Sequence, residues 1–279
     1  MTPDQLPWLA AGILLIALLY SSVGHAGASG YIAVMTLFGL APDEIKPIAL
    51  ALNILVASIG SWQFWRAGYF RLELFWPFAI CSVPMAFLGG YINLPAQWFK
   101  IAVGVVLLFS AARFLYDPKE ATTTSPPARG TSLVVGGMLG LLSGLTGTGG
   151  GIFLTPLMIV MRWAPTKVAS ATSVVFILVN STAGLLGNLA ATRAMPSFAI
   201  ALVATAAIGG SVGSYLGSRR FSAPAIKRLL AAVLIIAGLK LIGLELPVSA
   251  VKNRGESQRK APAAKGAAFP PNFVRANIP

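Results

Sequence analysis

Two glycine-rich breaks inside hydrophobic runs contain the residues best suited to bind a ligand. They span residues 24–30 (GHAGASG) and 147–151 (GTGGG). A helix that restarts after such a break has unpaired amide groups at the positive end of its dipole. Two helix starts of this kind, with the hydroxyl groups of Ser29 and Thr148, predict a binding site for an anion.

Polar residues in the apolar segments that follow the breaks extend this site. Asn53 and Ser58 lie in one such segment, and Thr172, Ser173, Asn180 and Ser181 lie in the other. Hydrogen bonds between helices would also explain these residues, and close helix packing would also explain the glycines. The predicted substrate-binding residues are Gly27, Ser29, Gly30, Asn53, Gly147, Thr148, Gly149, Gly150, Gly151 and Asn180.

His25 is the only histidine of the chain and the only side chain between residues 6 and 42 that titrates near neutral pH. An ionisable group at membrane depth is a functional candidate, here for proton coupling. The alternative is a neutral histidine that bonds to free carbonyl groups of the break. Neither break contains lysine or arginine. This suits a carrier, because a permanently charged partner would hold an anion too tightly for release.

The composition places these residues in a membrane. The chain has 279 residues, of which 56% are hydrophobic and 10% are charged, whereas soluble domains carry about 25% charged residues. Uncharged runs long enough to cross a bilayer predict an all-α polytopic membrane protein with the lipid bilayer as its partner. The net charge of +13 lies in loops and in the C-terminal tail. No folded basic face is visible, so we expect no nucleic-acid partner.

The apolar segments repeat. Each half reads as five segments, at about 6–22, 31–41, 48–65, 73–91 and 97–116, and then at about 131–146, 152–161, 168–190, 197–217 and 225–245. The second segment of each half covers about 15 Å, too little to span the hydrocarbon core. It therefore predicts a half-helix or the return arm of a re-entrant pair, which must be buried in protein or line a wet cavity.

Loop charges predict the topology. If the first two segments of each half return the chain to its starting side, most basic loop residues fall on one face, as the positive-inside rule requires. Each half then has odd parity, and the halves are inverted repeats. Each repeat has a glycine-broken or re-entrant helix pair plus three transmembrane helices. The predicted regions are a first repeat (1–117), a polar linker (118–130), a second repeat (131–246) and a basic, disordered tail (247–279).

Catalysis finds little support in the sequence. The stretch 27–30 matches the Gly-x-Ser-Gly of rhomboid-type proteases, but no histidine follows residue 25 to serve as a base. No His-Glu-x-x-His motif occurs either. We therefore expect no enzyme, no catalytic residue, no cofactor and no metal site.

The duplicated motifs resemble those of the sulfite exporter TauE/SafE family of bacterial membrane permeases. The resemblance rests on 27–30 and 147–151, on Leu-Thr-Pro-Leu at 154–157, on the Ala-Pro loops and on Ala-Thr-Ser at 171–173. It covers about residues 8–245. The first break departs from the family's usual glycine run at His25, Ala28 and Ser29, which would make the site asymmetric or alter the substrate.

The resemblance implies a transporter of sulfur oxyanions or organosulfonates in the bacterial inner membrane. Together with the breaks, the resemblance predicts a permease that holds a small anion between two helix starts and moves it by alternating access. A homo-oligomer is also compatible with the sequence. Two alternatives stay open. One is a transporter of an unrelated solute or cation on the same scaffold, and the other is a non-transporting membrane subunit.

Overall fold

The computed structural model describes residues 5–40, 42–92, 123–192 and 199–242, with four isolated positions at 108, 111, 112 and 115. Most of the predicted segment at 97–116 and the whole tail lie outside these residues, and the predicted domain boundaries stay predictions. Every regular element of the described part is a helix, as predicted. The helices are α1 (Leu6–Ser22), α2 (Ala28–Leu37), α3 (Pro42–Arg66), α4 (Leu72–Tyr91), α6 (Arg129–Thr146), α7 (Gly151–Val160), α8 (Thr166–Thr192), α9 (Ala199–Tyr215), the π-helical turn η2 (Leu216–Arg220) and α10 (Ala223–Ile242).

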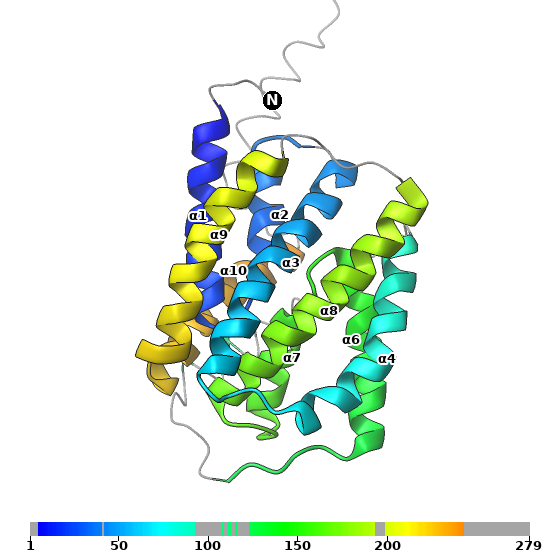
Figure 1. Cartoon of the computed structure of the whole chain (residues 1–279), viewed down its shortest axis with the longest axis vertical. Coiled ribbons are helices and arrows are strands. Elements are labelled where there is room, and N and C mark those ends of the chain that lie inside the picture. Colours follow the sequence, from blue (N-terminus) through cyan, green and yellow to red (C-terminus); the bar gives the residue numbers. More distant parts are fainter. Residues whose placement is uncertain are drawn as a thin grey trace, which may run out of the picture. The chain divides into compact units, whose positions relative to one another are not determined.

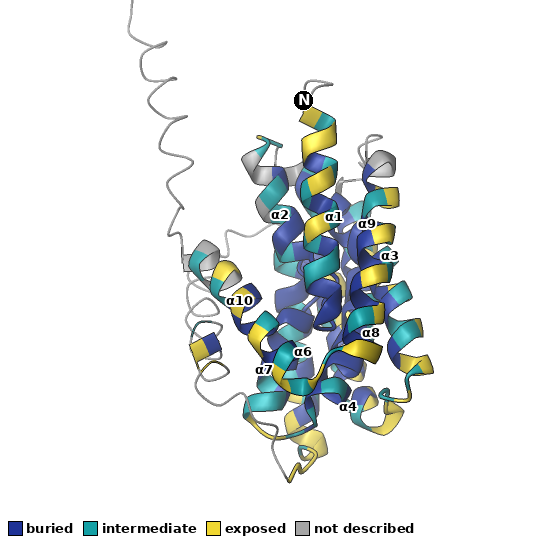
Figure 2. Cartoon of the chain, turned by 90° about the vertical axis from the view of Figure 1, so that its left-hand side faces the viewer, coloured by how far each residue is buried: buried dark blue, intermediate teal, exposed yellow. Residues whose placement is uncertain are grey.

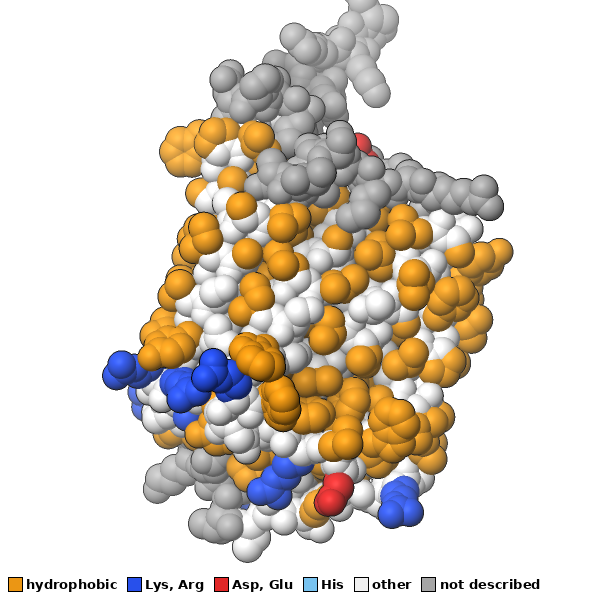
Figure 3. Space-filling model, viewed as in Figure 1, with side chains coloured by type: hydrophobic (Ala, Val, Ile, Leu, Met, Phe, Trp, Pro, Cys, Tyr) orange, Lys and Arg blue, Asp and Glu red, His pale blue; other side chains and the backbone are white. Residues whose placement is uncertain are grey.

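Apolar side chains cover the outside of the helices, as a lipid-facing surface requires. Three described helices are long and apolar enough to cross a membrane, at Glu44–Arg66, Leu72–Tyr91 and Thr166–Ala191. Large apolar residues such as Leu15 on α1 and Ile208 on α9 are more than half exposed. Figure 2 shows exposed positions along the outer sides of α1 and α9. Figure 3 shows hydrophobic side chains over the middle of the molecule and Lys and Arg gathered at its lower end. The protein is a multi-pass membrane protein.

Glycine stripes hold two helix pairs at backbone contact. An added Cβ at any stripe position would meet a backbone carbonyl of the neighbouring helix, so only glycine permits these approaches. On α6, Gly136, Gly140 and Gly144 face the carbonyls of Phe78, Ser82 and Ala86 of α4. On α9 and η2, Gly209, Gly213 and Gly217 face those of Leu14, Leu18 and Ser22 of α1. These glycines therefore serve close helix packing, and both helix pairs run parallel.

The centre of the bundle is the crossing of α3 and α8, the third helices of the two halves. They run antiparallel, because Asn53 bonds Ser181 while Gly60 meets Val174 (Figure 1). The buried residues of α3 and α8 meet α1, α2 and α9 on one side. On the other side α8 packs with residues of α4 and α7. This crossing therefore places both third helices against the short helices.

The short helices α2 and α7 confirm the prediction that the second segment of each half cannot span the membrane. Each has ten residues, or about 15 Å. One constant offset along the chain relates the starts of α1 and α6 (Leu6, Arg129), the starts of α2 and α7 (Ala28, Gly151) and their ends (Leu37, Val160). α1 runs inward from the upper end of Figure 1 and α2 returns to that end, where α3 begins.

Loops that carry basic residues contact one another at one end of the bundle. Lys167, at the start of α8, bonds Tyr69 of the α3–α4 loop and the carbonyl of Ser218 in η2. The amide of Ser125, just before α6, bonds the carbonyl of Arg162, just after α7. These contacts bring together loops from both halves of the chain.

Candidate functional site

The second break produces an uncapped helix start. Gly149 and Gly150 have φ of +76° and +78°, values that residues with a Cβ rarely adopt. Gly150 caps α7 without a side-chain hydrogen bond. The amides of Phe153 and Leu154 both bond the Gly150 carbonyl, at 3.1 and 3.2 Å. The amides that precede them in α7 have no intrahelical acceptor, and the helix dipole is positive at this point.

Side chains of α3 and α8 press closely on this break. A Cβ added at Gly149 would lie 2.7 Å from Ser181 Oγ and 2.8 Å from Asn53 Nδ2. A Cβ at Gly150 would lie 2.9 Å from Phe176 Cε1, and one at Gly151 would clash with the Ile177 side chain. The glycines therefore serve two needs: left-handed backbone at two positions, and space for the central helices.

The first break has similar glycine geometry but a capped helix. Gly24 and Gly27 also have positive φ, at +79° and +103°. Here, however, the first amide of α2, that of Ala28, donates to Asn53 Oδ1 at 3.0 Å. The same offset along the chain that makes Gly151 the equivalent of Ala28 makes Phe176 the equivalent of Asn53. Phe176 has no polar side-chain atom that could cap α7. The two helix starts are therefore unlike: Asn53 closes that of α2, and no side chain caps that of α7.

Asn53 links both breaks and the central crossing. Besides accepting from Ala28, its Nδ2 donates to the Thr148 carbonyl and to Ser181 Oγ, both at 3.3 Å. The side chain is fully buried. Because its two amide hydrogens and one oxygen lone pair are already in use, Asn53 connects protein segments in this conformation and has little capacity left for a substrate.

His25 joins the first break to the second. Its Nε2 lies 3.0 Å from the Gly151 carbonyl oxygen. A carbonyl only accepts, so Nε2 carries the hydrogen and donates. The alternative that the sequence predicts is a bond to carbonyl groups of the same break, but the acceptor belongs to the other break. The ring is 2% exposed, and Nδ1 has no partner among the described residues.

Three more buried side chains around the start of α7 lack partners within the described part of the chain. They are Ser143, Ser173 and Asn180, all fully buried, and Asn180 lacks a partner at both Oδ1 and Nδ2. Ser143 Cβ would lie 3.2 Å from a Cβ at Gly150, and the Ser173 carbonyl 3.0 Å from one at Gly151. Asn180 lies two turns after Ser173 on the stripe of α8 that faces the break. Buried polar atoms nearly always have partners, so these positions suit a polar ligand.

The other predicted substrate-binding residues have protein contacts in this conformation. Ser29 Oγ donates to the Tyr20 hydroxyl at 3.1 Å. Thr146 Oγ1 bonds the Leu142 carbonyl, so the 2.8 Å contact between the two threonine hydroxyls uses the hydrogen of Thr148. An added Cβ at Gly27 would meet the Tyr31 ring, and one at Gly30 would meet the side chains of Ile16 and Tyr20. An added Cβ at Gly147 would meet the Cγ atom of Lys46.

Ser58 does not belong to the group that the sequence analysis assembled. It is exposed, and its hydroxyl bonds the Ile54 carbonyl of its own helix at 2.7 Å. Lys46 and Ser170, by contrast, were missed. Lys46 packs against Gly147, and Ser170 Oγ bonds the Val23 carbonyl at 2.9 Å, beside the first break. Lys46 lies two helical turns before Asn53 on α3, and Ser170 lies three turns before Ser181 on α8. This helical spacing in the sequence could have indicated that both residues face the breaks.

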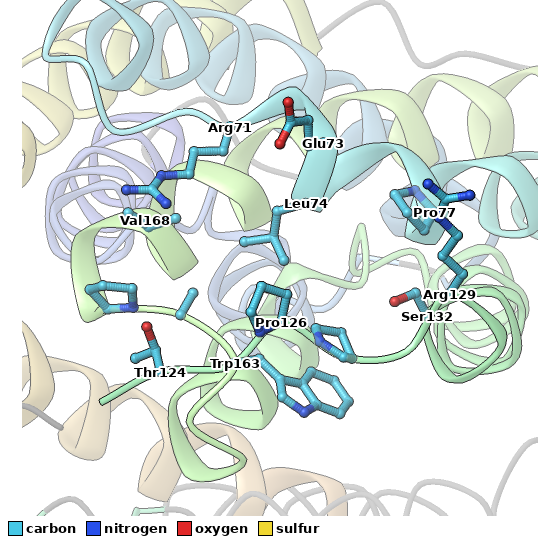
Figure 4. Close-up of a pocket in the computed structure, with 13 residues that line it drawn as sticks. Arg71, Glu73, Leu74, Pro77, Thr124, Pro126, Arg129, Ser132, Trp163 and Val168 are labelled. Carbon is cyan, nitrogen blue, oxygen red and sulfur yellow. The ribbon is translucent and has the colours of Figure 1, made fainter. Parts of the chain in front are cut away.

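A separate surface hollow of about 340 Å³ lies at the basic end, where α4, α6 and α8 begin. Arg71 and Arg129 lie on opposite sides of it, with Leu74 and Pro126 between them (Figure 4). Glu73 adds an opposing charge. None of the predicted site residues lines this hollow, and its two guanidinium groups do not converge on one point.

A protein-family model matches most of the chain. The family model described as "Sulfite exporter TauE/SafE" matches residues 9–241, which covers both breaks and the helices around them.

Three curated relatives bear the name of probable membrane transporter proteins. One, y4hK of Sinorhizobium fredii, is 41% identical over 239 residues, which cover 84% of this chain and 97% of the relative. YunE of Bacillus subtilis is 29% identical over 187 residues (59% and 68%). YjnA of Bacillus subtilis is 24% identical over 250 residues (82% and 96%). No solved structure matches the chain.

Proposed function

The chain belongs to the sulfite exporter TauE/SafE family, and on this premise we propose that it is a secondary transporter of a small sulfur oxyanion or organosulfonate. The substrate would bind at the start of α7. The bacterial inner membrane is its proposed location, with the lipid bilayer and the anion as its partners.

One observation carries the proposal: an uncapped helix start surrounded by buried polar atoms without partners. The first amides of α7 supply donors and a positive dipole end. The hydroxyls of Ser143 and Ser173 and the amide of Asn180 add neutral donors around it. A buried donor without a partner costs about 1–3 kcal/mol, and an anion that accepts from several of them removes that cost.

The proposed binding site is asymmetric. The equivalent start of α2 is already bonded to Asn53, so one anion per chain is expected at the second break. In this proposal Gly27, Ser29 and Gly30 shape the first break, and Gly147 to Gly151 provide the backbone at the substrate. Asn53 fixes the two breaks to each other, and Asn180 completes the donor set.

His25 is the proposed coupling residue. Its Nε2 hydrogen is committed to the Gly151 carbonyl, so the neutral ring presents a bare lone pair at Nδ1. Protonation of Nδ1 would turn this acceptor into a donor and add a positive charge beside Gly151, the first residue of α7. An anion bound there would favour the protonated ring, and the two would move together.

Alternating access between inverted repeats is the proposed mechanism. The constant offset between helix bounds and the antiparallel crossing of α3 and α8 support the inverted repeat. The glycine stripes pair α1 with α9 and α4 with α6. Because backbone contact holds each pair together, each would move as one rigid body about the α3–α8 crossing.

The experiment is uptake of radiolabelled sulfite and a sulfonate panel into proteoliposomes, with and without a pH gradient. Ser173→Ala is the first variant, because the Ser173 hydroxyl has no partner among the described residues. We expect unchanged thermal stability and a KM for sulfite about tenfold higher or more. Ser170→Ala is the matched control. It breaks the bond to the Val23 carbonyl, so it lowers stability and leaves KM unchanged.

The rival functions give different outcomes. A cation carrier would show competition by metal ions; the described residues contain no cluster of three His, Cys, Asp or Glu side chains that could hold one. A non-transporting subunit would show no saturable flux of any solute, and folded Gly150→Leu protein would have no flux phenotype. Either result would refute the proposed function.

A further inference from the structure

Lys46 is a cation beside the second break. It lies near the start of α3, and its side chain is half-buried. Its Cγ would lie 3.1 Å from a Cβ at Gly147, so the alkyl stem packs directly on the first residue of the break. The break itself has no basic residue, and this charge reaches it from another helix.

The ammonium group of Lys46 is only partly satisfied. Its Nζ donates to the Gly90 carbonyl, near the end of α4, at 3.2 Å. No carboxylate pairs with it in the described residues, and an ammonium group has three hydrogens to donate. Glycines surround this point: Gly90 touches Gly184 of α8, and Gly144 of α6 touches Ala86 of α4. Because these glycines have no side chains, backbone atoms lie close to the ammonium group of Lys46.

Lys46 and Asn53 lie on one stripe of α3. They are seven residues apart, or two helical turns and about 10 Å. Asn53 contacts Thr148 in the second break, and Lys46 contacts Gly147 from the side at which α3 begins. An anion that travels from that end of the bundle to the start of α7 would pass Lys46 before it reaches the break.

We infer that Lys46 is the anion-recognition residue at this mouth of the transport path. It would give an oxyanion one charge-assisted hydrogen bond on the way to the neutral site at α7. This inference rests on the proposed function and adds a binding residue to it. A single cation outside the break attracts the anion, while the neutral donors inside it allow release.

A purely structural role makes a different prediction. A lysine at the end of a helix can stabilise the last carbonyls and the dipole of that helix. In that case Lys46 would hold α4 in place, and its removal would lower stability without changing anion affinity. Lys46→Arg would then be no better than a neutral residue of the same length.

Lys167 is the matched control. It also lies near the start of a third helix, and its Nζ also donates to a backbone carbonyl, that of Ser218, at 3.5 Å. It has further contacts with Tyr69, a hydrogen bond to the hydroxyl at 3.3 Å and the ring centroid at 5.0 Å. Lys167 lies at the opposite, basic end of the bundle, so a variant there tests the other mouth.

The test measures sulfite entry from each side separately, in right-side-out and inverted membrane vesicles. For Lys46→Gln we expect KM to rise about tenfold or more in one vesicle orientation and to stay within twofold in the other. Lys46→Arg should recover most of the affinity. Lys46→Met keeps the stem on Gly147 and replaces Lys46→Gln if that protein does not fold. Lys167→Gln should leave KM unchanged at the Lys46 side.

The outcomes separate the two claims. Wild-type flux with an unchanged KM in Lys46→Gln, or an equal change in both orientations, overturns the inference and leaves the proposed function standing. A loss of thermal stability with unchanged KM assigns Lys46 to the structural role. If wild-type protein neither transports nor binds radiolabelled sulfite, the proposed function fails, and the inference fails with it.

Discussion

Replacement of Asn53 by leucine tests the link between the two breaks. Leucine has a similar shape and no polar atom, so the variant removes three hydrogen bonds without a large cavity. Asn53 bonds Ala28 at 3.0 Å, and Thr148 and Ser181 at 3.3 Å each. Side-chain hydrogen bonds inside membrane proteins contribute about 0.6 kcal/mol on average. We therefore expect Asn53→Leu to lower the free energy of unfolding by roughly 2 kcal/mol.

The assay is unfolding of the purified protein by sodium dodecyl sulfate in mixed micelles. A double-mutant cycle with Ser181→Ala isolates one of the three bonds, because Ser181 is a side-chain partner of Asn53. We expect a coupling energy of about 0.6 kcal/mol.

Two results would refute this reasoning. A free energy of unfolding unchanged to within 0.5 kcal/mol or so in Asn53→Leu would mean that the described bonds contribute nothing net. Additive effects in the cycle would mean that Asn53 and Ser181 do not interact in the folded protein.

Three further predictions concern packing, exposure and pH. Gly213→Ala should prevent assembly of the α1–α9 pair, because its Cβ meets the Leu18 carbonyl, whereas Gly130→Ala, with open space around it, should be neutral or stabilising in thermal unfolding. Ser58→Ala should leave sulfite KM unchanged and stability within about 0.5 kcal/mol, because this exposed hydroxyl bonds only its own helix; a raised KM would return Ser58 to the site. His25→Gln can still donate to the Gly151 carbonyl but cannot take up a proton, so flux should persist and lose its response to a pH gradient. An unchanged response would exclude His25 as the coupling residue.

The short helices were predictable from the sequence because their signal is local. A run of glycines interrupts an apolar segment, and the residues after it are too few to span the bilayer. The structure confirms α2 and α7 as ten-residue helices. α2 begins at Ala28, slightly before the predicted start near residue 31, since its backbone is already helical directly after Gly27.

The roles of individual polar residues were less predictable because they depend on helix orientation and on neighbours distant in sequence. Asn53 and Ser58 are five residues apart, roughly 140° around a helix, so only one could face the centre. A helical projection separates them but does not show that Asn53 reaches Ala28 and Thr148. Lys46 looks like a loop charge in sequence, and only the packing of α3 on Gly147 brings it to the break.

The glycine stripes also constrain the order in which the protein assembles during synthesis. α1 leaves the ribosome before the other described helices, but α9, whose glycines contact its carbonyl groups, follows only after α2 to α8. α4, by contrast, needs only α6 to be made before its carbonyl groups can contact their matching glycines. The first half of the chain therefore enters the membrane with α1 lacking its closest partner. The α4–α6 pair can form while α8 is still being made, whereas α1 must stay available until α9 has been made.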